Sequence, residues 1–212
     1  QKDFAPVSGM AEIPVAVIAH PSLPVNDMAD LVALAKKSPE SVTYGTAGPG
    51  TFPHLSVLML EKLAGVKLLA VHYRGVAPAL NDVTAGHVNM IVMGPSIAIP
   101  SYKAGKLKML GIGSDQPLPQ LPEVQPVSRT VAGYAASAGF GLAAPAATPR
   151  SVIVKINKDV QDVLADAEFQ EKILAPQSLL PIKGDADAFA AQLRAESQKW
   201  EKIIADASFE LK

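Results

Sequence analysis

The stretch VTYGTAGPGTFPHLSVLMLEKL, residues 42–63, joins a β-prone segment to a helical one through a turn rich in glycine. Valine, threonine and tyrosine at its start favour an extended chain, and the residues after the turn carry apolar side chains at helical spacing. Gly65, just beyond the stretch, is placed to end that helix in a left-handed conformation. The stretch predicts a strand, a tight turn and a helix. One apolar face of that helix carries Leu55, Leu58, Met59 and Leu63.

The same alternation of β-prone runs and helical segments continues on both sides of this stretch. Further β-prone runs occupy residues 15–20, 67–73, 88–93 and 107–113. Further helical segments occupy residues 26–39, 76–86, 96–105, 150–174 and 185–207. Asn26 or Asp27 is placed to cap the first of these helices. Strands that alternate with helices are typical of an α/β protein with a mostly parallel sheet.

The distribution of strands predicts two lobes. Residues 20–136 hold four β–α units, which is enough for a self-standing α/β ligand-binding lobe. The flanks, residues 1–19 and 137–212, contain hinge strands and amphipathic helices but too few strands for a sheet of their own. A strand such as FGLAA (140–144) needs neighbours that satisfy its backbone groups. We therefore expect both flanks to belong to another lobe, whose remainder lies upstream of Gln1.

Composition excludes several classes of function. Apolar residues make up 49% of the 212 residues and charged residues 18%, which excludes a disordered chain. The net charge of -1 argues against a nucleic-acid partner, which needs a basic face. Cysteine is absent, so disulfides, thiol nucleophiles and cysteine metal sites are excluded. The longest apolar run, residues 90–100, is interrupted by Gly94 and Pro95 and is too short to span a bilayer.

The turn between the strand and the helix has the features of an anion-binding site. Gly48 and Gly50 let the backbone approach a ligand closely, and the N–H groups and the helix dipole favour negative charge there. The hydroxyls of Thr46 and Thr51 add hydrogen-bond donors. The spacing excludes a P-loop, a dinucleotide-binding fingerprint and a nucleophile elbow. The alternative is a tight β–α turn in which Thr51 only caps the helix.

His54 lies in the first turn of the predicted helix. The positive end of the helix dipole disfavours an imidazolium, so we expect a neutral ring that donates one hydrogen bond to a ligand oxygen. The alternative is a histidine hydrogen-bonded to its own loop. The histidines at 20, 54, 72 and 87 lack ligand spacing, and we expect neither a metal nor a cofactor.

Two further loops follow predicted strands. Arg74 and Gly75 bring a cation and free amides to a helix start, although an arginine here is also typical of a solvated surface. Met93 and Gly94 begin a loop at residues 93–96. In open α/β sheets, ligands bind at the carboxyl ends of the strands. We therefore expect these two loops and the turn after the first strand to line one cleft. No carboxylate pair or nucleophile–base pair accompanies them, which predicts recognition without reaction.

Several of these segments resemble, in the same order, the solute-binding receptors of tripartite tricarboxylate transporters, the Bug family. The resemblance covers essentially the whole chain and is carried by residues 3–24, 42–90, 102–114 and 139–149. It implies a periplasmic type II binding-protein fold of two α/β lobes, of which this chain holds one complete lobe and the C-terminal part of the other. The family's ligands are small carboxylates, including dicarboxylates, tricarboxylates, acidic amino acids and aromatic acids.

The resemblance also implies a function and a site. It implies a non-enzymatic periplasmic receptor that captures a small carboxylate and delivers it to membrane permease subunits. The implied contacts of the complete lobe are Thr46, Ala47, Gly48, Gly50, Thr51 and His54. Gly75 and the loop 93–96 would line the same cleft, and a glycine-rich anion loop of the other lobe would lie upstream of Gln1.

Two residues depart from the family pattern. The family often has an acidic residue where this chain has Met93, and an acidic or similar residue where it has Asn89. Without a carboxylate beside the cleft, the ammonium of an amino acid would lack a counter-charge. Met93 suits an apolar group, so we expect a carboxylate with an apolar portion.

Two other functions stay open on the sequence. One is a cytoplasmic ligand-sensing domain of a regulator with the same fold. The other is an enzyme that acts on a phosphorylated or carboxylated substrate, for which His54 and Tyr73 are the acid–base candidates.

Overall fold

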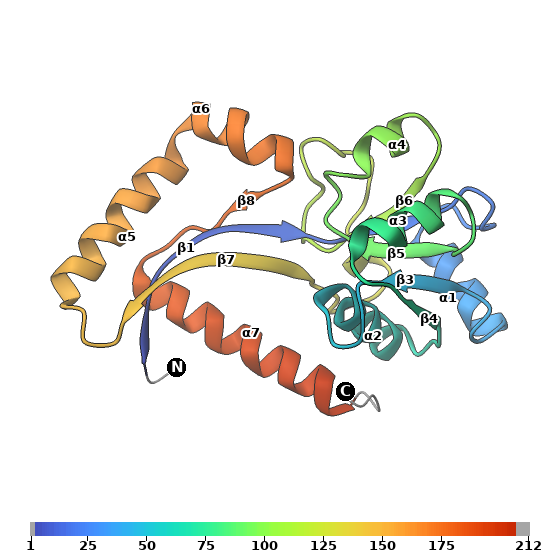
Figure 1. The fold of residues 1–212 in the computed structure, drawn as a ribbon, viewed down its shortest axis with the longest axis horizontal. Coiled ribbons are helices and arrows are strands. Elements are labelled where there is room, and N and C mark those ends of the chain that lie inside the picture. The colour runs from blue at the N-terminus through green and yellow to red at the C-terminus, as the bar shows by residue number, and fades with distance from the viewer. Residues whose placement is uncertain (1–2, 207–212) are drawn as a thin grey trace. The chain divides into compact units, whose positions relative to one another are not determined.

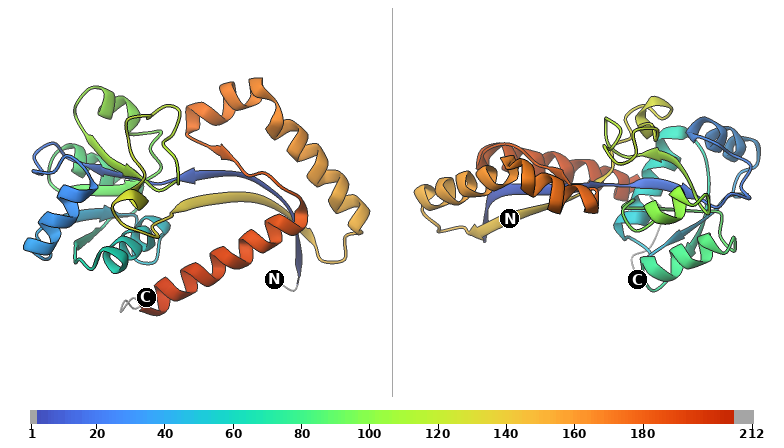
Figure 2. Two further views of the ribbon diagram at one scale, coloured as in Figure 1. Left: turned by 180° about the vertical axis from the view of Figure 1, so that it is seen from behind. Right: turned by 90° about the horizontal axis from the view of Figure 1, so that it is seen from above.

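Two sheets organise the chain in the computed structural model, which describes residues 3–206 (Figure 1). Each sheet belongs to its own unit. The first unit comprises residues 1–13 and 138–202, and the second comprises residues 14–137 and 203–212. Figure 2 shows the elements of each unit from two further directions.

The second unit is built on a five-stranded sheet in the order β4-β3-β5-β2-β6. β3 is parallel to β4 and β5, whereas β2 is antiparallel to both of its neighbours. Every residue of β2 is buried, as expected for an apolar run at an interior position of a covered sheet. The strands are β2 (Ala16–Ala19), β3 (Thr43–Thr46), β4 (Leu69–His72), β5 (Met90–Met93) and β6 (Lys108–Ile112). The predicted α/β class is confirmed.

The helices of this unit begin and end at residues suited to those positions. They are α1 (Met28–Lys37), α2 (Phe52–Ala64), α3 (Val76–Thr84), α4 (Ile99–Lys103) and the 3-10 helix η1 (Val127–Arg129). Asp27 caps α1 by accepting a hydrogen bond from the Asp30 N–H, and Gly65 ends α2 at φ 64°. Both predicted caps are confirmed. Ala79 of α3 lies 3.1 Å from where a Cβ would stand on Gly45, so the helix packs closely on β3.

α2 buries only part of the predicted face, on which Met59 is 3% exposed. Leu63, predicted on the apolar face, is 41% exposed, whereas Val57 is 0% exposed and Leu60 is 1% exposed. Glu61 is also buried, and its carboxylate accepts a hydrogen bond from the Leu68 N–H at 2.6 Å. The helix is apolar around most of its circumference, so the spacing of its leucines does not determine which face meets the sheet.

The boundary between the units lies earlier in the chain than the predicted flank. β1 (Phe4–Pro14) occupies most of the predicted hinge segment. The N-terminal segment of the first unit ends at Ile13. β2, which we placed in the flank 1–19, belongs to the sheet of the second unit. A four-residue strand with every side chain buried needs a partner on each side, and β5 and β6 supply them.

The first unit contains a three-stranded sheet in the order β7-β1-β8 within the described residues, so the expectation that the flanks hold too few strands for a sheet of their own is wrong. β7 is Ser137–Pro145, and β8 is the short strand Leu180–Pro181, which pairs antiparallel with β1. α7 (Ala186–Asp206) packs on one face of this sheet: a Cβ on Gly141 would lie 2.2 Å from Cζ of Phe189. The glycine therefore allows a close approach between the helix and β7.

The predicted helix over residues 150–174 is wrong as a single element. It divides into α5 (Arg150–Ala165), α6 (Ala167–Phe169) and the π-helix η2 (Gln170–Leu174), and the 3-10 helix η3 (Ala175–Gln177) follows. Asp166 leaves the helical conformation at ψ 123°, and its carboxylate accepts a hydrogen bond from the Phe169 N–H at 2.7 Å. Aspartate favours such a cap over a helix interior, and this local competition ends α5.

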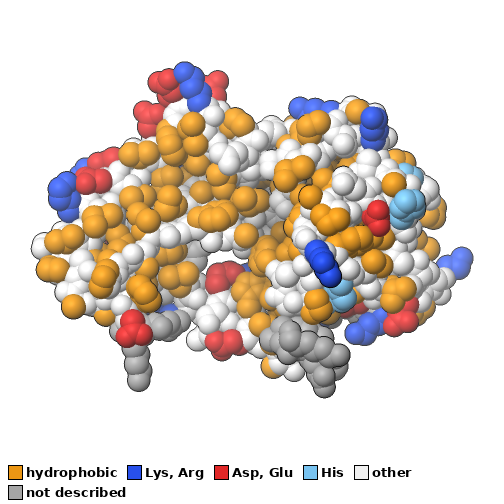
Figure 3. All heavy atoms as spheres, viewed as in Figure 1, with side chains coloured by type: hydrophobic (Ala, Val, Ile, Leu, Met, Phe, Trp, Pro, Cys, Tyr) orange, Lys and Arg blue, Asp and Glu red, His pale blue; other side chains and the backbone are white. Residues whose placement is uncertain are grey.

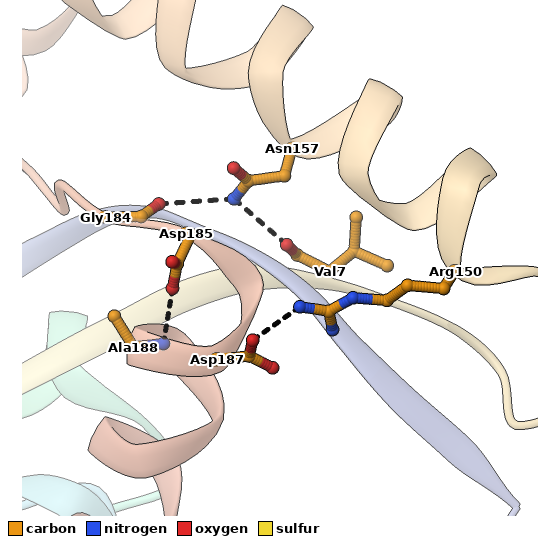
Figure 4. A network of polar contacts seen from close by, with 7 residues as sticks. All are labelled: Val7, Arg150, Asn157, Gly184, Asp185, Asp187 and Ala188. Atoms are coloured by element: carbon orange, nitrogen blue, oxygen red, sulfur yellow. Dashed lines mark hydrogen bonds and ion pairs between the residues drawn. The ribbon is translucent and has the colours of Figure 1, made fainter.

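Polar side chains connect α5 to β1, to the loop before α7 and to α7 itself (Figure 4). The Asn157 amide donates hydrogen bonds to the carbonyls of Val7, at 3.1 Å, and Gly184, at 3.2 Å. Arg150 and Asp187 form an ion pair between the start of α5 and the start of α7. Because both partners are well exposed, that ion pair contributes little, whereas buried Asn157 satisfies two backbone carbonyls. Within residues 3–206, no helix has the length and apolar character to cross a membrane.

Candidate ligand-binding site

The turns after β3, β4 and β5 meet at one edge of the five-stranded sheet. Thr46 at the end of β3 is paired with His72 at the end of β4, and the Tyr73 N–H donates to the Thr46 carbonyl at 2.8 Å. β5 runs in the same direction on the other side of β3. The carboxyl ends of parallel strands share an edge, so the structure brings the predicted loops together there.

Much of the hydrogen-bonding capacity of the first turn is used within the turn. The hydroxyls of Thr46 and Thr51 both donate to the Gly48 carbonyl, at 3.0 and 2.7 Å. The Gly48 N–H donates to Oγ1 of Thr46 at 3.0 Å, and the Thr51 N–H donates to the Gly48 carbonyl at 3.3 Å. The turn therefore leaves fewer amides and hydroxyls for an anion than the sequence indicated. Short hydroxyl side chains pair with nearby backbone groups when the chain turns tightly.

His54 is bonded to its own loop, the alternative that the sequence left open. The Gly50 N–H donates to Nδ1 of His54 at 3.0 Å, and His54 is 5% exposed. Burial lowers the pKa of His54, and the nearby His72 lowers it further. The neutral imidazole was predicted from the helix dipole; in the structure, burial and a second histidine favour it.

The Ala47 N–H, in the same turn, donates no hydrogen bond to any described residue. The second turn is also open: Gly75 precedes α3 at φ 126°, and a Cβ built there would meet nothing within 4 Å. Arg74 beside it is exposed and forms no ion pair with residues 3–206. The free donors at this edge of the described chain thus come from Ala47, from the start of α3 and from Arg74.

The third turn contributes less surface than the sequence indicated. Met93, the last residue of β5, is 5% exposed and pairs with Ala16 of β2, so it belongs to the core. Gly94, which follows it, is half-buried.

Asn89 lies away from this edge, and the expectation that it replaces an acidic group beside the cleft is wrong. It precedes β5, at the opposite end of that strand from Met93. Its Oδ1 accepts hydrogen bonds from the Thr43 N–H at 2.9 Å and from the Thr43 hydroxyl at 3.0 Å. Asn89 therefore connects the starts of two parallel strands.

Tyr73 is a neighbour of the site that sequence reasoning named only as an acid–base candidate. Its hydroxyl donates to Oδ2 of Asp82 at 2.6 Å, and its ring lies 3.5 Å from where a Cβ would stand on Gly45. Burial and the Asp82 carboxylate raise the pKa of Tyr73 to about 12. The spacing from a strand end to the second turn of the next helix was the available signal for this pair.

The arrangement can bind a small anion through backbone amides and a guanidinium. Arg74 is the charged residue in the three turns, residues 47–51, 73–75 and 94–98. Among residues 3–206, no group of three or more histidine and acidic side chains could hold a metal ion.

Comparison with known proteins shows that nearly the whole chain matches one protein family. The sequence model of one family, described as the tripartite tricarboxylate transporter family receptor, matches residues 1–209. A protein of the tcbD-tcbE intergenic region of Pseudomonas sp. strain P51 is 30% identical over 97% of this chain and 61% of its own length. BugT of Bordetella pertussis is 24% identical over 100% of this chain and 65% of its own length. The chain thus spans less than two thirds of the length of these relatives.

Solved structures give the same result. Rpa4515 of R. palustris with adipate has a TM-score of 0.80 and 29% identity, over 95% of this chain and 68% of that chain. The periplasmic binding protein BugD has a TM-score of 0.77 and 27% identity, over 98% of this chain and 70% of that chain. MatC of Rhodopseudomonas palustris with bound malate has a TM-score of 0.75 and 25% identity, over 95% of this chain and 69% of that chain.

Proposed function

Because the chain belongs to the receptor family of the tripartite tricarboxylate transporters, we propose that it binds a small organic carboxylate for transport. One observation carries this proposal: the turns at the carboxyl edge of the sheet hold an exposed arginine, open backbone donors and no acidic residue. Two structural relatives, Rpa4515 and MatC, hold adipate and malate, both of which are dicarboxylates. The proposed role is capture without chemical conversion.

The proposed site divides the predicted residues by role. The Ala47 N–H, the amides that follow Gly75 and the Arg74 guanidinium would contact the carboxylate, because these donors are open. Hydrogen bonds from backbone N–H groups and a helix start favour an anion, and an arginine adds a charge-assisted bond. The side chains of Thr46, Thr51 and His54 and the amides of Gly48 and Gly50 would hold the turn in shape. Met93 and Gly94 would lie at the base of the site.

The remaining parts of the function are proposals about a longer receptor. We propose that such a receptor works in the periplasm and delivers its ligand to membrane permease subunits. In a receptor of the relatives' length, the added residues would extend the first unit and supply further ligand contacts. Each lobe would then contribute part of the binding free energy when the lobes close on the ligand.

Calorimetric titration tests the proposal with adipate, malate, an aromatic acid and an acidic amino acid, on this chain and on a receptor of the relatives' length. We expect the longer receptor to bind at least one of these acids at micromolar or lower Kd. Arg74→Gln should weaken that binding about tenfold to a hundredfold, because a hydrogen bond to a charged group contributes about 1.5–3 kcal/mol.

Lys37→Gln is the matched control, because it removes one positive charge in the last turn of α1, which leads into the amino end of β3. It should leave the affinity unchanged. A longer receptor that binds none of the four acids would overturn the proposed function. Equal losses for Arg74→Gln and Lys37→Gln would overturn the assignment of Arg74 to the site.

A further inference from the structure

His54 accepts a hydrogen bond that only its neutral form can accept. The Gly50 N–H points at Nδ1 of His54, at 3.0 Å. A neutral imidazole has one nitrogen that accepts and one that donates, whereas an imidazolium donates from both. The Gly50 contact therefore fixes the proton on Nε2 and is lost when Nδ1 is protonated.

The surroundings of His54 favour this neutral form. His72 from β4 meets it edge-on, with 5.3 Å between ring centroids, and Tyr44 from β3 is stacked at 6.4 Å. Burial raises the pKa of Tyr44, and Glu61, on the same helix as His54, raises it further. Burial and the second histidine both work against a charged ring.

We infer that His54 is a positioning residue whose neutral ring holds Gly50 in place and whose protonation releases the turn that carries the Ala47 N–H. Gly50 has φ 71°, a conformation that the rest of the turn must keep fixed. The next residue, Thr51, holds the Gly48 carbonyl, and Gly48 in turn bonds to Thr46. Loss of the Gly50 bond removes one link from this short network, so the turn loosens in acid. The effect on ligand affinity rests on the proposed function, but the state of the free turn does not.

Nuclear magnetic resonance on the ligand-free chain tests the inference directly. The imidazole nitrogen shifts should report an Nε2–H tautomer for His54 at pH 7.5 and a pKa below the ordinary histidine value. The hydrogen-exchange protection factor of the Gly50 amide should fall at least tenfold as His54 becomes protonated. An Nδ1–H tautomer, or protection at Gly50 that does not follow the titration of His54, would overturn the inference.

Two variants separate positioning from general stability. His54→Asn keeps an acceptor near the Nδ1 position that does not titrate, so Gly50 protection should persist and be independent of pH between 5 and 8. His54→Phe removes the acceptor, so protection at Gly50 should be low at every pH. If either variant fails to fold, the tautomer and the Gly50 titration of the unmodified chain still decide the question.

Calorimetric titrations of the longer receptor connect the turn to binding. The ratio of Kd for the unmodified receptor to Kd for His54→Asn should rise at least threefold from pH 7.5 to a pH one unit below the pKa that nuclear magnetic resonance gives for His54. The ratio cancels the ionisation of the ligand itself, which both proteins experience equally. Absence of binding in both proteins would contradict the proposed function and leave the result on the free turn intact, whereas a constant ratio would contradict the role of His54 in affinity.

Discussion

Asn89 and Thr43 form a reciprocal hydrogen-bonded pair between β5 and β3. Oδ1 of Asn89 accepts from the Thr43 N–H and hydroxyl, and the Asn89 N–H donates to Oγ1 of Thr43 at 3.0 Å. The pair stands where both strands begin, and it fixes the register in which Tyr44 lies opposite Met90. It lies at the far end of the strands from the proposed ligand site.

Replacement of Asn89 should therefore affect stability rather than ligand recognition. Asn89→Ala leaves the Thr43 N–H without its partner, and we expect a loss of about 1–3 kcal/mol in the free energy of unfolding. Asn89→Asp keeps an acceptor oxygen and should stay within about 1 kcal/mol of the unmodified chain at neutral pH. Urea unfolding measures both. Equal stability of Asn89→Ala and the unmodified chain would contradict the structural role.

Local signals in the sequence predicted much of the second unit. Asp27 and Gly65 mark helix ends by their own backbone and side-chain preferences, so no knowledge of the fold was needed to place them. The break at Asp166 was missed, because aspartate is also tolerated within a helix and the apolar spacing continues beyond it. Part of the buried face of α2 was missed because the sheet, and not the helix, selects it.

For the site, the sequence likewise predicted the features that depend on the order of the elements, but not those that depend on tertiary packing. The order of strands and loops predicted which turns share an edge, and this is a topological consequence. The choice of partner for each donor was not predictable. The Thr46 hydroxyl can reach a ligand or the Gly48 carbonyl, and its rotamer and burial decide between them.

Glu61 gives a prediction with a defined pH dependence. Burial raises the pKa of this carboxyl, while the Leu68 N–H and Lys67 oppose the shift. A raised folded-state pKa means that the folded chain binds the proton more tightly than the unfolded chain does. The stability contribution is therefore present below the unfolded pKa and is lost as pH rises through the folded pKa.

Glu61→Gln removes this loss, because the amide oxygen can still accept from the Leu68 N–H without a buried charge. We expect Glu61→Gln to gain stability relative to the unmodified chain as the pH rises from about 4 to 7. Glu61→Ala, which leaves the Leu68 N–H unpaired, should lose about 1–3 kcal/mol. Thermal unfolding across this pH range measures the difference. A constant gap between Glu61→Gln and the unmodified chain would contradict the raised pKa.

Two glycines of β7 provide a matched pair in the first unit. A Cβ on Gly141 would stand 2.2 Å from Cζ of Phe189, whereas a Cβ on Gly139 would stand 3.9 Å from Cδ1 of Ile182. Gly141→Ala should therefore destabilise the first unit by about 1–3 kcal/mol through overpacking. Gly139→Ala should be neutral or slightly stabilising.

Double substitution checks the cause of the Gly141 effect. Phe189→Leu removes the clashing ring atoms, so Gly141→Ala should cost less in that background than in the unmodified chain. Chemical unfolding of the four proteins gives the coupling free energy. Additive effects of the two substitutions would show that the contact between Gly141 and Phe189 is not the cause.

The apolar surface of the first unit provides a test of the proposed extension by further chain. Phe140 is 50% exposed and Leu142 is 37% exposed. Side chains alternate along a strand, so both point away from the face on which Gly141 meets Phe189. Phe4 and Met10 of β1 are exposed as well, and apolar side chains cover much of this unit in the view of Figure 3. Contiguous exposed apolar surface of this kind marks an interaction site.

Leu142→Ser should then destabilise two proteins to different extents. In this chain the side chain is 37% exposed, so the substitution should cost about 1 kcal/mol and should reduce self-association in analytical ultracentrifugation. In a receptor of the relatives' length, we expect the same side chain to be covered, and its loss should cost about 2–4 kcal/mol. Leu69→Ser, at a residue of the second unit that is 47% exposed and lies at the start of β4, away from the three turns, is the control and should be neutral in both. Similar small effects of Leu142→Ser in the two proteins would contradict the proposal, because they would show that the added chain leaves this strand in water.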